Sequence, residues 1–134
     1  MTSTERRSRI EQMYGPGCMI ECISPSVATE RAEELTRAST AGDLGSSNGY
    51  FAGMATELLS RYLLAAAILG EDSATILSWA RSRGAQPWTA LAERDDIVPE
   101  GWLSTRETID SLPAATQAAC FATVLSALRL PADG

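Results

Sequence analysis

The chain has 134 residues, enough for one domain with a hydrophobic core, and its net charge is −6 because eleven arginines face seventeen acidic residues. It contains no lysine and no histidine, and nothing marks one Glu/Asp pair for acid–base work, so the sequence predicts that the chain is not an enzyme. The acidic balance also disfavours duplex nucleic acid as a partner, since binding phosphates needs clustered positive charge.

Residues 1–23 are interpreted as an N-terminal arm. Its first nine residues are polar and the apolar core of a signal peptide does not follow them, so no secretory signal is expected. Gly15-Pro16-Gly17 enforces a turn. The apolar stretch CMIECI, from Cys18 to Ile23, is expected to be a strand or a buried extended lead-in, and the arm as a whole is expected to be flexible or only locally ordered.

Three cysteines, Cys18, Cys22 and Cys120, are too few for a secreted disulfide framework. Cys18 and Cys22 also lack the two further ligands that a zinc site needs. We therefore expect reduced thiols, with Cys120 buried and inert, in a cytoplasmic protein that holds no metal and no cofactor.

A helix is predicted to begin after Ser24, a plausible N-cap, with Pro25 in the first helical position. It should end near Thr40. The Gly-, Ser- and Asn-rich residues 41–49 are interpreted as a connecting loop.

The segment that follows is the most informative in the chain. Apolar residues cover most sides of a helix predicted over residues 50–69, and its polar positions are Glu57, Ser60 and Arg61. Its longest apolar run is far shorter than the about 20 residues of a membrane span, so no membrane insertion is expected. A helix apolar on so many sides lies among several others, which predicts an all-α fold: a compact bundle of five or six helices around this central one, within a single domain over residues 24–131.

Several local signals predict the remaining helices. Gly70 should end the central helix, Asp72 or Ser73 should cap the next, and Gly84 should end that one. Pro87 opens a short helix, and Ser104 with Glu107 forms the S-x-x-E pattern of a capping box. A last helix follows Pro113, with a predicted apolar seam of Ala114, Ala118, Phe121, Leu125 and Leu128.

Tryptophans and arginines are the candidate binding residues, because both are enriched at interface hot spots. Trp79 lies one helical turn from Ile76 and Arg83 and is assigned to the core. Trp88 and Trp102 are predicted to be partly exposed surface anchors. Arg81, Arg83 and Arg94 bracket Trp88 and are candidates for a basic, aromatic patch that grips an acidic protein or a single strand. The alternative is an ordinary hydrated surface, on which Glu93, Asp95 and Asp96 cancel much of the positive charge of the arginines.

A second candidate is acidic. Glu30, Glu33 and Glu34 lie on the first long helix and offer a face to an Arg-rich partner; a hydrated face is the alternative.

From Ser24 to Pro131, the order of these elements resembles the all-α domain of type IV secretion system coupling proteins, the ATPases of conjugation, in their actinobacterial form. The resemblance is carried by TERAEEL after Ser24-Pro25, the Gly-rich loop, Phe51, LLSRYLLAAAILG, ILSWA and the closing TQAACFATVLSALRLP. In that family the domain is inserted in a RecA-like motor at the cytoplasmic mouth of a hexamer. The motor's nucleotide-binding loops are missing here, so ATP hydrolysis is not carried over.

The resemblance implies a non-catalytic recognition domain that helps a conjugative motor to select cargo for DNA transfer. Its partners would be a relaxase or secreted protein and the remainder of the coupling ATPase, at the cytoplasmic face of the inner membrane. The alternative is a small helical adaptor, such as an antitoxin, an immunity protein or a phage-encoded factor, that acts by occluding a partner protein. Single-stranded DNA is a third candidate partner, which the acidic charge disfavours.

Overall fold

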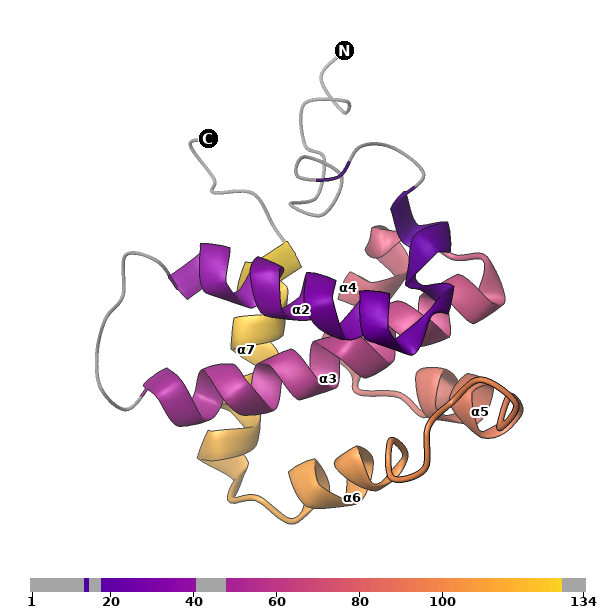
Figure 1. The fold of residues 1–134 in the computed structure, drawn as a ribbon. Coiled ribbons are helices and arrows are strands. Elements are labelled where there is room, and N and C mark those ends of the chain that lie inside the picture. The colour runs from indigo at the N-terminus through magenta and orange to yellow at the C-terminus, as the bar shows by residue number, and fades with distance from the viewer. Residues whose placement is uncertain (1–13, 15–17, 41–47, 129–134) are drawn as a thin grey trace.

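The computed structural model describes Tyr14 and residues 18–40 and 48–128, which fold as an all-α bundle (Figure 1). This confirms the predicted fold class. In chain order the elements are the 3-10 helix η2 (Cys18–Ile23) and the α-helices α2 (Pro25–Thr40), α3 (Asn48–Leu69), α4 (Ser73–Ser82), α5 (Gln86–Ala92), α6 (Ser104–Asp110) and α7 (Ala114–Leu128).

Helix α3 is the centre of the bundle, as its sequence predicts. It contacts η2 and every one of α2, α4, α5, α6 and α7, and α2 lies antiparallel beside it (Figure 1). Each side chain from Tyr62 to Ala66 is at most 1% exposed, so the helix is buried around its whole girth. Burying one leucine contributes about 1.5–3 kcal/mol, so the two leucines of this stretch contribute substantially to stability. Within the described ranges, no helix is long and apolar enough to cross a membrane.

Several helix ends follow from local chemistry. Helix α2 begins at Pro25, as predicted. Helix α3 ends at Leu69, and the Gly70 predicted to stop it follows directly, with a φ of 71° that suits a residue without a side chain. The backbone N–H groups of Gly70 and Glu71 donate to the carbonyls of Ala67 and Ala66, at 3.3 and 2.8 Å, which satisfies the last turn. Asp72 caps α4 by accepting a bond from the backbone N–H of Thr75.

The strand or extended lead-in expected over Cys18–Ile23 is wrong, because the segment is the 3-10 helix η2. A strand needs a neighbouring strand to pair its backbone, and the surrounding elements are helices, so the segment forms local bonds instead. It packs against α2 and α3 with Cys22 in the core, while Ile20 remains 73% exposed. The predicted loop over 41–49 lies outside the described residues except for its last two, which already belong to α3.

The capping box predicted at Ser104 and Glu107 is also wrong. Leu103 holds the N-cap position in a helical conformation, and no side chain caps the helix there. The turn before α6 runs directly into it, so Ser104 lies in the first turn and its hydroxyl donates to the Gly101 carbonyl at 2.6 Å.

The end of α4 differs from its prediction in a way that matters for the site. Arg83, and not Gly84, adopts the left-handed conformation that ends the helix, with φ 57° and ψ 35°. Its backbone N–H donates to the Trp79 carbonyl at 2.7 Å. This conformation costs a residue with a side chain more than it costs glycine.

The buried face of α7 is rotated from the predicted seam. Ala114 and Ala118 are exposed and Leu125 is half-buried, because α7 packs against α2, α3 and α4 through a different stripe. That stripe consists of Cys120, Phe121, Val124, Ala127 and Leu128. Cys120 is buried, as predicted, and burial raises the pKa of its thiol.

Candidate functional site

The two tryptophans predicted as surface anchors lie in different surroundings. Trp88 is only 7% exposed, so the prediction of partial exposure is wrong for it. Its indole packs beside the Tyr62 ring, with the ring centroids 6.0 Å apart. Trp102 is half-buried, as predicted. Trp79 is a core residue, as predicted, and its indole N–H donates to Gln86 Oε1 at 3.0 Å.

The three candidate arginines are likewise separated. Arg83 and Trp88 line one small pocket, whereas Arg81 is exposed and lines neither of the hollows described below. Arg94 forms two bonds of 2.9 Å with the Asp96 carboxylate. This pairing lowers the pKa of Asp96, and it cancels much of the charge that Arg94 would offer to a partner, as the acidic neighbours in the sequence suggest.

A shallow, open groove of about 660 Å³ runs between the first turns of α2 and the segment before α6. We call it the α2 groove. It joins two prolines, an indole, two hydroxyls and two carboxylates, a mixture that binds cations and extended polypeptide. Its lining residues are Pro25, Ser26, Thr29, Glu30, Glu33, Pro99 and Trp102.

Trp102 is held in the α2 groove by the central helix. The guanidinium of Arg61 lies over the indole, 4.1 Å from the ring centroid, and Arg61 Nε–H lies 3.4 Å from the Trp102 carbonyl oxygen. The same Nε–H donates to Thr105 Oγ1 at 3.0 Å. Arg61 is largely buried, and burial lowers its pKa, an effect that the charge of Glu57 opposes.

The remaining polar positions of α3 complete this network. Thr105 donates from its hydroxyl to Glu57 Oε2 at 2.6 Å, and the same carboxylate lies 3.6 Å from Arg61 Nη2. Ser60 Oγ accepts a bond from Arg61 Nη1 at 3.0 Å. Glu57, Ser60 and Arg61 therefore belong to one network, which fixes α6 and Trp102 against α3.

The three glutamates of the acidic face of α2 lie in two different surroundings. Glu30 and Glu33 are exposed in the α2 groove, and neither forms an ion pair with a residue that the structure describes. Glu34 instead accepts a hydrogen bond from the Tyr14 hydroxyl, whose pKa is raised by burial and by that bond. The Tyr14 ring lies under the guanidinium of Arg31, 4.2 Å from its centroid.

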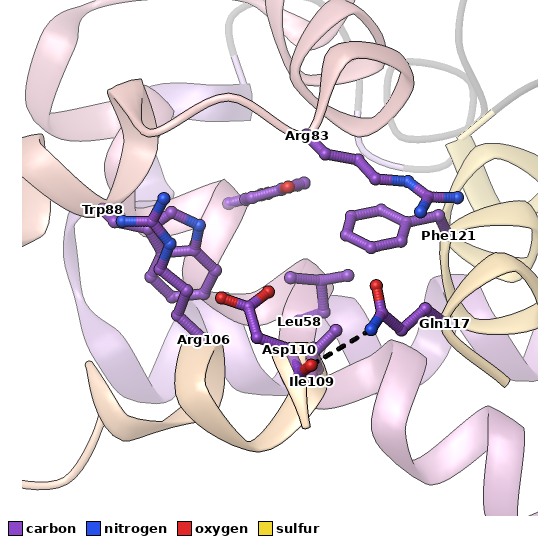
Figure 2. A pocket seen from close by; sticks show the side chains of 9 residues that line it. Leu58, Arg83, Trp88, Arg106, Ile109, Asp110, Gln117 and Phe121 are labelled. Atoms are coloured by element: carbon purple, nitrogen blue, oxygen red, sulfur yellow. Dashed lines mark hydrogen bonds between the residues drawn. The ribbon is translucent and has the colours of Figure 1, made fainter. Parts of the chain in front are cut away.

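A second, smaller hollow lies where α3, α5, α6 and α7 meet near the end of α4 (Figure 2). We call it the α4–α7 pocket. Its free volume is about 50 Å³, and both aromatic or aliphatic and polar side chains line it. Its three charged side chains are exposed and stand at its mouth. It is lined by Leu58, Tyr62, Arg83, Trp88, Arg106, Ile109, Asp110, Gln117 and Phe121.

Sequence reasoning missed two of the residues that shape these sites. Arg61 shows in the sequence only as a polar position on α3, and its stacking on Trp102 crosses 41 residues of chain. Arg106 carries no local signal that connects it with Arg83. One signal could have indicated the contacts of Arg61: an arginine on a mostly apolar helix must find a partner when it is buried.

No family model, no curated protein and no solved structure matches the chain.

Proposed function

We propose that the chain is a protein-recognition domain that binds an extended, arginine- or lysine-rich segment of a partner protein in the α2 groove. One observation carries the proposal: Trp102 is fixed by the central helix in a groove that also presents the unpaired carboxylates of Glu30 and Glu33. Such a groove offers a cationic side chain both an aromatic surface and a counter-charge.

The charge of the whole chain supports a basic partner. At a net −6, the molecule attracts a basic segment from a distance and repels an acidic one, with a strength that falls as salt rises. A surface cation–π contact contributes about 0.5–1 kcal/mol and an exposed ion pair about 0–1 kcal/mol. Tight binding therefore requires several basic residues along the groove, which favours an extended segment over a single side chain.

Rigidity of the groove supports the same proposal. Trp102 is stacked on Arg61, and Arg61 is bonded to Thr105, so little side-chain freedom is lost when a partner arrives. No chemistry on the partner is needed for this function, which is recognition by surface complementarity.

A narrower version of the proposal takes its partner from the sequence resemblance. In it, the bound segment is the basic tail of a relaxase or of another secreted substrate, and the chain works beside a conjugative motor at the cytoplasmic face of the membrane. The helix order and the acidic groove support this version. An adaptor that occludes a basic segment of an unrelated partner uses the same groove chemistry and remains the alternative.

Fluorescence anisotropy with a labelled, Arg-rich peptide of about ten residues tests the proposal. We expect saturable binding that weakens with salt, and no binding of a Glu-rich peptide of equal length. Glu30→Gln combined with Glu33→Gln should weaken binding roughly tenfold, since two ion pairs are lost.

The matched control is Glu93→Gln combined with Glu107→Gln, two exposed acids outside the groove that change the net charge equally. If this control weakens binding as much as the groove variant, the attraction is diffuse charge and not a site. Preferential binding of a single-stranded oligonucleotide over the basic peptide overturns the proposal in favour of a nucleic-acid binder.

A further inference from the structure

Tyr62 is a buried residue whose hydroxyl has no partner. The residue is 1% exposed, and its ring packs against Trp79 and Trp88, with centroids 5.9 and 6.0 Å away. Its Oη forms no hydrogen bond with any residue in the described ranges, and it lines the α4–α7 pocket. Burial raises the pKa of Tyr62, so the group stays protonated and remains a donor. The hydroxyl is therefore a donor that no described protein acceptor occupies and that a ligand in the pocket can use.

Two arginines stand at the mouth of the same pocket. Arg83 and Arg106 are exposed, and neither forms an ion pair with a residue that the structure describes. Arg31, Arg61 and Arg94 each pair with a carboxylate, whereas Arg81, which is exposed and lies outside the pocket, resembles Arg83 and Arg106 in forming no ion pair with a residue that the structure describes. In a chain with more acids than bases, two unpaired guanidinium groups at one pocket favour an external anion.

The position of Arg83 is fixed rather than loose. Its guanidinium lies over the Phe121 ring, 4.5 Å from the centroid, and Figure 2 shows both side chains at the rim of the pocket. Its backbone holds the left-handed conformation that glycine usually supplies. A costly backbone conformation at a pocket rim is the pattern expected where the side chain has a task.

The other polar groups of the pocket restrict what fits. The side-chain amide of Gln117 donates hydrogen bonds to the carbonyls of Asp110 and Leu112, at 3.2 and 2.9 Å. Only its oxygen, which is an acceptor, is left to face a ligand. The Asp110 carboxylate also lines the pocket, and Figure 2 shows it between Arg106 and Gln117. This negative charge opposes a dianion more strongly than a monoanion. The free volume of about 50 Å³ suits a small planar group.

We propose that the α4–α7 pocket binds a carboxylate group, which accepts a hydrogen bond from the Tyr62 hydroxyl and charge-assisted bonds from Arg83 and Arg106. The carboxylate belongs either to a small organic acid or to an acidic residue or chain end of a peptide, since the same donors serve both. This site is independent of the α2 groove, which takes cations.

Titration of the ¹⁵N-labelled chain, followed by the indole N–H resonance of Trp88, tests this site. The probes are sodium acetate, sodium phosphate and sodium chloride at equal ionic strength. We expect saturable shifts with acetate and weaker or unsaturated shifts with phosphate and chloride. A blocked peptide with one aspartate and a peptide with a free carboxyl end then identify the source: binding of either, or of acetate, supports the site, and absence of all three overturns it.

Variants separate the site from general anion binding. Tyr62→Phe keeps the aromatic packing and should weaken acetate binding roughly five- to tenfold, as should Arg83→Gln. Arg81→Gln, an equal charge change on the same helix outside the pocket, should leave it unchanged. Arg83→Gly, which suits the left-handed backbone, guards against a folding defect. Asp110→Asn should strengthen binding. Equal affinities in Tyr62→Phe, Arg83→Gln and wild type, or tighter binding of phosphate than of acetate, overturn the proposal.

Discussion

The α2 groove and the α4–α7 pocket lie on the same bundle but are built by opposite means. The groove holds its indole, Trp102, with a polar network that reaches out from the central helix. The pocket holds its indole, Trp88, by packing aromatic rings around Tyr62. One site is open and acidic, and the other is small, with two unpaired arginines at its mouth. The contrast shows that the exposure of each tryptophan depends on residues far away in the sequence that pack against it. The residues next to it in the sequence indicate little about its exposure.

The largest expected effect distinguishes the two indoles by their burial. Trp88→Ala removes a nearly buried ring and leaves a cavity beside Tyr62, which should cost about 3–5 kcal/mol in the free energy of unfolding. Trp102→Ala should cost clearly less, because that indole is already half in solvent. Urea denaturation followed by circular dichroism measures both losses.

Trp88→Phe serves as the milder variant if Trp88→Ala does not fold, and it should lose less stability than the alanine variant. Equal losses for Trp88→Ala and Trp102→Ala would contradict the contrast, since they would mean that both indoles are equally buried.

A second prediction compares one variant at each site in both binding assays. Arg61→Met keeps the apolar stem but removes the guanidinium that joins Trp102, Thr105 and Glu57, so we expect a loss of about 1–3 kcal/mol in stability. Binding of the basic peptide should weaken with it, while acetate binding in the α4–α7 pocket should persist. Arg106→Met should do the reverse: stability changes by no more than about 0.5 kcal/mol, acetate binding falls, and peptide binding persists.

Unfolding curves and the two binding titrations, run on both variants, check this crossing. A variant that weakens both kinds of binding equally would show that the two sites are coupled, against the separation argued above.

The sequence predicts most of the helical frame from local signals, although two of these signals, the capping box at Ser104 and Gly84 as the end of α4, are wrong. Apolar periodicity identifies α3, and Pro25, Gly70 and Asp72 mark helix ends by their own backbone chemistry. It fails where a residue's state depends on distant partners. Trp88 follows Pro87 and looks like a surface residue, yet Tyr62, 26 positions earlier, covers it. The acidic half of the α2 groove was predictable from Glu30 and Glu33, but its other wall comes from Pro99 and Trp102, which only the packing of α6 on α3 brings there.

The smallest predicted effect concerns Arg83. The proposed site needs its guanidinium, whereas its left-handed backbone favours glycine. A left-handed residue with a side chain costs about 1–2 kcal/mol, which Arg83→Gly relieves. Glycine also makes the unfolded chain more flexible and loses the contact with Phe121, each worth about 0.5–1 kcal/mol, so the net change should lie within about 1 kcal/mol of zero. Arg83→Ala keeps the strained backbone and loses the same contact, so it should be less stable than Arg83→Gly. Urea denaturation of both variants measures this order; if alanine is as stable as glycine, the left-handed backbone carries no cost, and the stacking of Arg83 on Phe121 is left as the only sign that its place at the pocket is fixed.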